Sequence, residues 1–208
     1  MIKIYGILQS RALRPLWALE EAEADYEFVP MDMLKDEHKS DWFRALNPAC
    51  KVPAMSDDDF TLIESGAICQ YIANKYSSAQ LIPKEGSRER ALFDQWMFYI
   101  VSELEQPLWT LGKHKFALPK EHRVEAVLKT AIYEFSKALQ PLAQAMQNKK
   151  FLVGEQFTVA DIMAGQTLLW ALKYDVPIGI PHLQQYAGEL KNRPAFKRVI
   201  SKFGGQKS

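Results

Sequence analysis

The sequence lacks the features that mark several classes of protein. Its two cysteines, Cys50 and Cys69, are too few for a disulfide framework and have no Cys or His neighbours at metal-ligand spacing. We therefore expect reduced thiols and no metal. Lys and Arg number 26 against 25 Asp and Glu, a net charge of +1, so no overall field favours binding to nucleic acid or to an acidic membrane.

The sequence also lacks any long apolar run. No stretch approaches the ~20 apolar residues that span a bilayer, and the first residues show neither an apolar leader nor a small-residue cleavage site. We therefore expect a cytoplasmic protein with no membrane partner and no nucleic-acid partner. Hydrophobic residues make up 48% of the 208, which is enough for a sizeable core in one large domain or two smaller ones.

The first thirty residues predict a strand, a helix and a second strand. Residues 2–5 are typical of a short strand, and helical spacing follows from about residue 11 to residue 24. Pro15 fits a helix only in its first turn, because it has no N–H and its ring clashes with the carbonyl four residues back. We therefore expect this helix to begin close to Ser10. Residues 26–31 complete a βαβ unit, whose crossover requires parallel strands.

The next segment predicts a helix, a hairpin and another helix. A polar helix is expected over residues 36–46, followed by two short strands over 52–55 and 60–63 around an aspartate-rich turn. Proline limits the pairing of the first of these strands, because it has no N–H. A helix over residues 65–76 then completes the order βαβαββα.

A polar linker separates this α/β part from a part that is predicted to be all helical. The stretch after Tyr76 contains Pro83 and Gly86, which is typical of a linker. We expect an α/β domain at residues 1–77, a linker at 78–87 and an all-helical bundle at 88–208. The helices of the bundle are expected at about 88–111, 120–148, 158–173 and 182–202.

One helix start in the second domain has a clear signature. Thr158 can accept a hydrogen bond from the N–H of Asp161, while the Asp161 carboxylate reaches back to Thr158. Phe157 and Ile162 are placed as a hydrophobic staple around this capping box. The pattern needs no ligand, and we interpret it as a folding signal.

Three motifs together resemble those of one known family, the cytosolic glutathione S-transferases. Residues 47–55 (NPACKVPAM) resemble the family's segment leading into a cis-proline, and residues 64–68 (ESGAI) resemble its acidic-hydroxyl motif. Residues 157–161 (FTVAD) resemble its capping box. The motifs occur in the right order and spacing over nearly the whole chain. The resemblance implies a thioredoxin-like N-terminal domain, a helical C-terminal domain and glutathione as cosubstrate.

The resemblance places the glutathione cradle at two of these motifs. A cis bond between Val52 and Pro53 would leave the N–H and C=O of Val52 facing outward, where an extended peptide such as glutathione can pair with them. Ser65 opens a helix, so its hydroxyl and N–H can meet the γ-glutamyl carboxylate, while Glu64 can pair with the α-amino group. Taken alone, a trans proline and a simple N-cap serine are the commoner interpretations.

Nearby polar residues are candidates for binding the glycyl carboxylate at the other end of glutathione. Lys51 is the first candidate. His38 resembles a histidine before the second helix in some classes of the family, although a lone surface histidine often has no such role. Cys50 departs from the family, in which glycine is frequent before Lys-Val-Pro, and we interpret it as a tolerated loop residue whose thiol could form a mixed disulfide.

Catalysis requires a thiolate, whereas a free thiol with a pKa near ~8.5 is only ~3% ionised at pH 7. Ser10 lies after the first strand with the spacing of serine-type, bacterial-type members of the family, and the resemblance assigns it to the bound thiol. Arg11 could add a stabilising charge or be an ordinary surface arginine. Tyr5 is the competing activator, because other classes use a tyrosine there, but its place in a mostly buried strand favours a core role.

The electrophilic substrate is the part of the reaction that the sequence specifies least. It should lie against the helical domain, where each candidate side chain is singly more typical of a core. The candidates are Trp96, Phe98, Tyr99, Leu104, Trp109, Trp170, Lys173 and Tyr174. We expect glutathione transfer to small hydrophobic electrophiles; a glutathione-dependent isomerase, reductase or dehalogenase and a non-catalytic interaction protein stay open. The resemblance also implies a homodimer.

Overall fold

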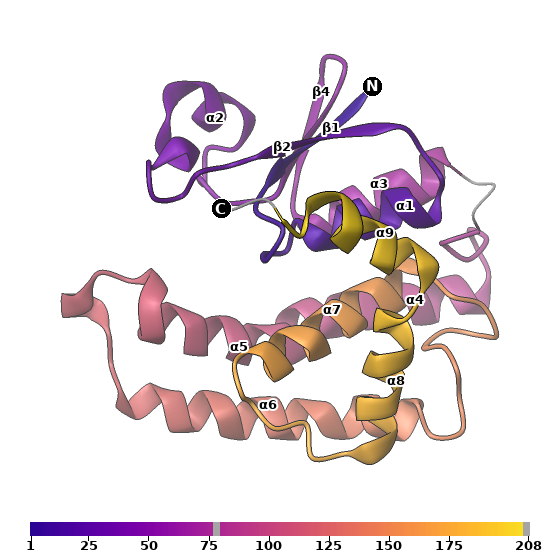
Figure 1. Ribbon diagram of the computed structural model, residues 1–208. Coiled ribbons are helices and arrows are strands. Elements are labelled where there is room, and N and C mark those ends of the chain that lie inside the picture. Colours follow the sequence, from indigo (N-terminus) through magenta and orange to yellow (C-terminus); the bar gives the residue numbers. More distant parts are fainter. Residues whose placement is uncertain (77–79, 206–208) are drawn as a thin grey trace. The chain divides into compact units, whose positions relative to one another are not determined.

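The computed structural model describes residues 1–76 and 80–205 of the chain, which its internal contacts divide into two compact units (Figure 1). The first unit is Met1–Pro83 together with the segment from Lys191 onward, and the second is Lys84–Leu190. The contacts thus assign the C-terminal helix to the first unit, whereas the sequence predicted a domain running from residue 88 to the end. The start of the predicted linker, at residues 78 and 79, lies outside the described residues.

A four-stranded mixed sheet forms the centre of the first unit. The strands are β1 (Ile2–Gly6), β2 (Tyr26–Pro30), β3 (Ala54–Asp57) and β4 (Phe60–Ile63), in the order β2-β1-β3-β4. β1 pairs with β2 in parallel and with β3 antiparallel, and β3 and β4 form a hairpin. The predicted βαβ unit and hairpin are therefore confirmed. The third strand begins at Ala54 rather than at residue 52, since Pro53 has no N–H for the ladder.

The helices of the first unit begin later, or are more broken, than the sequence predicted. Helix α1 (Leu13–Glu21) starts three residues after Ser10, because the intervening chain forms a turn in which the Leu13 N–H donates to the Ser10 carbonyl at 3.2 Å. The predicted helix over 36–46 is a 3₁₀ turn, η1 (Glu37–Lys39), followed by α2 (Asp41–Leu46). Ser40 is extended and caps α2 through its side chain, which separates the two. Helix α3 spans Ser65–Lys75.

Strand β1 carries core residues on one face, Tyr5 on the other face and a glycine at its end. Ile2 and Ile4 are fully buried, and Tyr5 points to the other face, where it packs against the small core of Met31, Phe43 and Ala54. Gly6 ends the strand. A Cβ at Gly6 would lie 2.6 Å from the Ala12 Cβ, so only glycine allows the following loop to fold this closely against the strand.

The last helix, α9 (Pro194–Phe203), is fastened to α1 by aromatic packing and by ion pairs. The Trp17 and Phe196 rings meet edge to face with centroids 4.9 Å apart. Arg193 donates two hydrogen bonds to the Glu21 carboxylate, at 2.6 and 2.8 Å, and Arg198 Nε donates to the buried Glu20 carboxylate at 2.7 Å. These contacts are the physical reason why the end of the chain clusters with its beginning.

The second unit is all helical, as predicted. Its elements are α4 (Arg88–Tyr99), η3 (Ile100–Leu104), α5 (Glu105–Gly112), η4 (Lys113–Ala117), η5 (Lys120–His122), α6 (Ala126–Ala145), α7 (Val159–Lys173) and α8 (Pro181–Lys191). The single helix expected over 88–111 is interrupted at η3, a π-helical turn that lies just before Pro107. Because Pro107 cannot donate a helical hydrogen bond, a wider turn before it is a common adjustment.

The predicted capping box starts α7 and is completed by two further residues. Asp161 is fully buried; its carboxylate accepts hydrogen bonds from the Thr158 N–H at 2.8 Å and from the Thr158 hydroxyl at 3.1 Å. It also accepts from the Leu152 N–H at 2.8 Å and from the Tyr186 hydroxyl at 2.6 Å. The box therefore ties the start of α7 to a loop and to α8.

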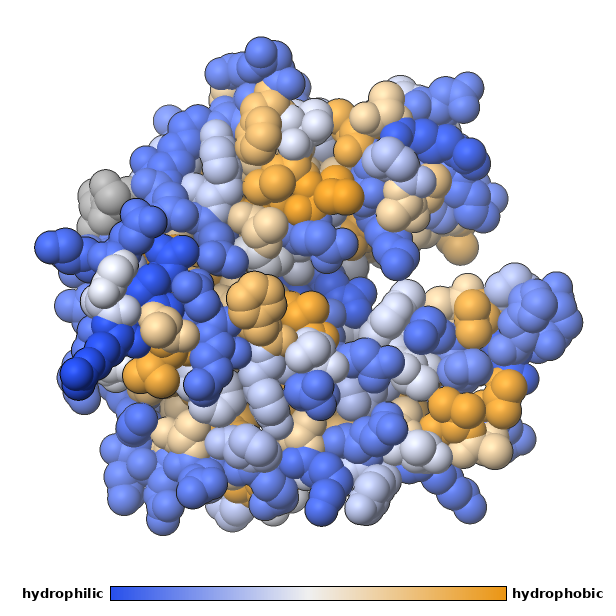
Figure 2. Space-filling view, turned by 180° about the vertical axis from the view of Figure 1, so that it is seen from behind, coloured by the Kyte–Doolittle hydropathy of each residue, from blue (hydrophilic) through white to orange (hydrophobic). Residues whose placement is uncertain are grey.

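The helices of the described chain are too short or too polar to cross a bilayer. Hydrophilic side chains cover most of the face seen in Figure 2, with apolar patches between them. Among the exposed large apolar residues, Phe98 is 76% exposed on α4, and Val101 follows it three residues later in η3 at 45%.

Candidate functional site

Ser10 lies in the turn between β1 and α1, where its hydroxyl is half-buried and engaged. Ser10 Oγ donates to the Ile7 carbonyl at 2.6 Å and accepts from the Ala12 N–H at 3.1 Å. The hydroxyl therefore stands in a local turn rather than at the cap of α1, which begins at Leu13. To donate to a ligand sulfur, the Ser10 O–H has to turn away from the Ile7 carbonyl.

Tyr5, the competing activator, has its hydroxyl engaged on the sheet. Tyr5 Oη and Ser56 Oγ, on β3, lie 3.1 Å apart within hydrogen-bond distance. The ring packs at a tilt against Trp42, with centroids 6.0 Å apart. This agrees with a core aromatic whose polar end has found a partner.

The Val52–Pro53 bond is cis, as the sequence predicted, and it immediately precedes β3. The approach to it is a turn in which the Cys50 N–H donates to the Asn47 carbonyl at 2.9 Å, and Asn47 Nδ2 donates to the Lys51 carbonyl at 2.7 Å. Cys50 has φ +54°, in the left-handed region. This conformation explains why glycine suits the position and why cysteine is an unusual occupant.

Glu64 and Ser65 stand at the junction of β4 and α3. Glu64 is the N-cap, with φ +70° and ψ 112°, and its carbonyl accepts the first helical bond from the Ile68 N–H at 2.9 Å. Ser65 is the first residue of the helix rather than its cap and is only 5% exposed. The Glu64 side chain is exposed, so the carboxylate and the hydroxyl of this pair occupy different environments.

A residue that sequence reasoning missed lies behind Ser65. Arg14, in the first turn of α1, is 1% exposed, and its Nη1 donates to Ser65 Oγ at 3.1 Å. The signal in the sequence was an arginine within an otherwise apolar stretch, next to Pro15. Arg11, which the sequence did single out, is half-buried in the turn that carries Ser10.

Lys51 and His38 differ in their surroundings. The Lys51 side chain is exposed. The His38 side chain, in η1, is 14% exposed, and its Nε2 lies 4.0 Å from Asp36 Oδ1. Among the described residues, His38 Nδ1 is the buried side-chain polar atom that has no hydrogen-bond partner.

The two thiols also differ. Burial raises the pKa of Cys69 to about 12, although the charge of Arg14 opposes the rise, so this thiol stays protonated and unreactive. Cys50 Sγ is only partly buried and contacts the Pro48 carbonyl at 3.8 Å. Over the part of the chain that the structure describes, no group of three or more His, Cys, Asp or Glu side chains is arranged to hold a metal.

The aromatic candidates of the helical unit divide into core and partly exposed residues. Trp96 is 8% exposed and belongs to the core. Tyr174 stacks on Phe116 with centroids 5.8 Å apart and planes 12° apart, and Trp170 meets Tyr174 at 6.1 Å. Phe116, which sequence reasoning did not name, is 48% exposed, so this cluster offers an apolar surface.

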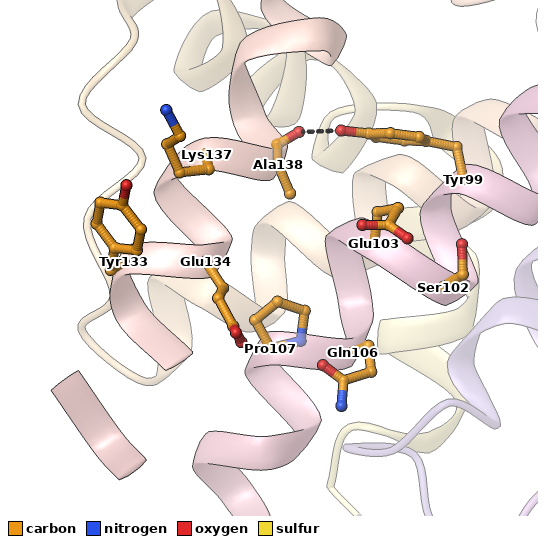
Figure 3. Close-up of a pocket in the computed structure, with 9 residues that line it drawn as sticks. All are labelled: Tyr99, Ser102, Glu103, Gln106, Pro107, Tyr133, Glu134, Lys137 and Ala138. Atoms are coloured by element: carbon orange, nitrogen blue, oxygen red, sulfur yellow. Dashed lines mark hydrogen bonds between the residues drawn. The ribbon is translucent and has the colours of Figure 1, made fainter. Parts of the chain in front are cut away.

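A separate cavity of about 430 Å³ lies between α6 and the run of η3 and α5 (Figure 3). Its lining includes the carboxylates of Glu103 and Glu134. The Tyr99 hydroxyl at its edge donates to the Ala138 carbonyl at 3.0 Å. A polar, charged lining of this kind is unsuited to an apolar electrophile.

A mixed sheet of this order with a cis-proline before its third strand, together with an all-helical unit, defines a two-part protein with a thioredoxin-like half. Comparison with known families gives two matches, "Glutathione S-transferase, N-terminal domain" over residues 1–74 and "Glutathione S-transferase, C-terminal domain" over residues 105–194. The chain is 31% identical over 215 residues to "Probable glutathione S-transferase GSTF2" of Oryza sativa subsp. japonica, covering 96% of each.

A bacterial relative and a solved structure agree with these matches. "Glutathione S-transferase GstA" of Escherichia coli O157:H7 is 30% identical over 190 residues, covering 89% of this chain and 90% of the relative. The crystal structure of glutathione transferase F7 from Populus trichocarpa superposes with a TM-score of 0.85 at 28% identity, covering 97% of this chain and 98% of the other. The chain therefore belongs to the glutathione S-transferase family, and the predicted fold class and glutathione transferase enzyme are confirmed.

Proposed function

We propose that the chain binds glutathione at its first unit, ionises the thiol beside Ser10, and directs the thiolate at a small hydrophobic electrophile. The observation that carries the proposal is the coincidence, within one compact unit, of the cis Val52–Pro53 bond and a buried Ser65 at the start of α3. A main-chain edge and a helix N-terminus are the two features that an extended anionic peptide requires.

Glutathione is held along its length by complementary groups. The main chain of Val52 pairs with the cysteinyl residue, as an added strand would. The N–H and hydroxyl of Ser65 meet the γ-glutamyl carboxylate, which the dipole of α3 also favours, and the exposed Glu64 pairs with the α-amino group. Lys51 and His38 serve the glycyl carboxylate, and the unpartnered Nδ1 of His38 supports its inclusion.

Ser10 stabilises the thiolate by exchanging one hydrogen-bond acceptor for another. Its O–H leaves the neutral Ile7 carbonyl, to which it donates at 2.6 Å, for a negatively charged sulfur. A hydrogen bond to a charged acceptor is stronger than one to a neutral acceptor, so the exchange favours the ionised thiol. A depression of the thiol pKa by ~2 units corresponds to ~2.7 kcal/mol, to which the positive charge of Arg11 contributes.

The chemical step forms a carbon–sulfur bond. The thiolate supplies the electron pair; in a displacement a carbon–halogen bond breaks and halide leaves, and in an addition the electrophile takes up a proton from solvent. Glutathione-dependent isomerases, reductases and dehalogenases use the same cradle, so these activities are the alternatives, together with a non-catalytic interaction role.

We further propose a homodimer that works in the cytoplasm. Phe98 and Val101, three residues apart on one helical run, leave an apolar surface that self-association would cover. The free Cys50 and Cys69 agree with a reducing compartment. Analytical ultracentrifugation of the wild type and of Phe98→Glu tests the dimer, since the charged variant should sediment as a monomer.

Calorimetric titration with glutathione, followed by a panel of aryl halides, alkyl halides and unsaturated carbonyl compounds, tests the proposed function. We expect binding at millimolar concentration or tighter, and conjugates detectable by mass spectrometry. Binding without any conjugate would favour the interaction role. No binding at millimolar glutathione would refute the cradle.

A further inference from the structure

Arg14 occupies a position that the binding of glutathione does not by itself require. Its side chain is 1% exposed between α1 and α3, which pack side by side against the sheet (Figure 1). A buried arginine is uncommon, because its charge has to be taken out of water, so its placement calls for a physical role. Arg14 Nη1 donates to Ser65 Oγ at 3.1 Å, which joins it directly to the proposed carboxylate site.

The chemistry of this contact fixes its direction. A guanidinium can only donate hydrogen bonds, whereas a serine hydroxyl has one proton to donate and two lone pairs with which to accept. Ser65 Oγ must therefore accept from Arg14, and its own proton remains for another acceptor. Ser65 is the first residue of α3 and 5% exposed, so a small part of its surface reaches the solvent side where a ligand can approach.

We propose that Arg14 is a positioning residue that occupies one lone pair of the Ser65 hydroxyl and so orients its proton toward a ligand carboxylate. The inference rests on the proposed binding of glutathione and makes Arg14 responsible for selecting its γ-glutamyl carboxylate. The positive charge of Arg14 also reaches the inner face of α3, since it opposes the rise in the pKa of Cys69, one turn after Ser65. Both effects favour an anion at the start of α3.

The experiment compares two ligands and four variants by calorimetric titration. The ligands are glutathione and 4-aminobutanoyl-cysteinylglycine, which is glutathione with the γ-glutamyl carboxylate replaced by hydrogen. The variants are Arg14→Met, which has similar length but no charge or donor, Arg14→Lys, Ser65→Ala and the double variant Arg14→Met with Ser65→Ala. Arg193→Met is the matched control, because it removes an arginine of the same unit whose ion-pair partner, Glu21, lies at the other end of α1 from Arg14.

We expect Arg14→Met to weaken glutathione binding about tenfold or more, as the loss of a charge-assisted contact would, and to change binding of the analogue less than threefold. Arg14→Lys should retain part of the affinity, because it keeps a charge and donors. In the Ser65→Ala background, Arg14→Met should have a much smaller effect on glutathione. Arg193→Met should lower the melting temperature without changing the ratio between the two ligands.

Two results would overturn the inference while leaving the proposed function intact. One is wild-type binding of glutathione with no loss on Arg14→Met. The other is an equal loss for both ligands, which would mean that Arg14 only supports the packing of α1 on α3. If the wild type itself does not bind glutathione, the proposed function and this inference fall together, so the two failures are distinguishable.

Discussion

Replacement of Asp161 should destabilise the helical unit by a predictable amount. The carboxylate is fully buried; its Oδ1 accepts from the Leu152 N–H and the Tyr186 hydroxyl, and its Oδ2 accepts from the Thr158 N–H and hydroxyl. Asp161→Ala leaves these donors without partners, at about 1–3 kcal/mol for each buried group. Because neighbouring losses are not additive, we expect a total of about 3–5 kcal/mol.

A second variant divides this sum between the two oxygens. Asp161→Asn keeps an oxygen for Leu152 and Tyr186 but puts an amide where the Thr158 groups need an acceptor. We therefore expect about 2 kcal/mol, which lies between the wild type and the alanine variant.

Urea denaturation followed by far-ultraviolet circular dichroism measures both variants. Asp94→Ala is the control, because Asp94 is 42% exposed and pairs with Arg90 only within α4, so its loss should cost less than about 0.5 kcal/mol. If Asp161→Ala costs no more than Asp94→Ala, the buried hydrogen bonds do not stabilise the unit and the reasoning is refuted. An equal cost for the asparagine and alanine variants would refute the division between the two oxygens.

Four further outcomes are expected. Ser10→Ala should raise the pKa of the bound glutathione thiol, measured by a thiolate difference spectrum, and should lower turnover at pH 7 by about 10–100-fold with little change in affinity. Tyr5→Phe, the control, should leave turnover and affinity within about twofold of the wild type. Equal effects of the two variants on turnover would remove Ser10 from its role. Gly6→Ala should cost about 1–3 kcal/mol, because its Cβ would lie 2.6 Å from a neighbouring Cβ, and an unchanged melting temperature would contradict this. Cys50→Gly should stabilise the chain by up to about 1 kcal/mol in urea titrations, because it relieves φ +54°; a loss of stability would show that the thiol is needed there. Burial acts to raise the pKa of Glu20, but its hydrogen bonds outweigh burial and lower the pKa below the ordinary value. The contribution of Glu20 to stability should therefore be complete above about pH 5 and be lost as the pH falls further. Glu20→Gln should flatten this dependence of the unfolding free energy on pH.

The features that could be predicted from the sequence are those that depend on a few neighbouring residues. The hairpin follows from two short apolar runs around aspartates, the capping box from Thr158 and Asp161, and the parallel βαβ unit from the alternation of patterns. The cis bond at Pro53 required the family resemblance, because proline alone favours a trans bond, and the glutathione cradle around it stays a prediction.

The features that were missed depend on residues far apart in the chain. Arg14 and Ser65 are separated by 51 positions, and nothing local to either indicates that they meet. The π turn before Pro107 and the late start of α1 depend on a choice between closely similar backbone registers, which periodicity does not resolve. In the same way, the hydrophobic periodicity of α9 does not predict which unit it packs against, since an amphipathic helix can pack against either.

The fastening of α9 to α1 has a consequence for the order in which the protein can be completed during synthesis. Trp17, Glu20 and Glu21 are made well before their partners on and beside α9, because the whole helical unit is synthesised between them. Until α9 is made, Trp17 lacks the Phe196 ring and the two carboxylates lack their arginines. The first unit can therefore complete its fold only after the helical unit has been synthesised.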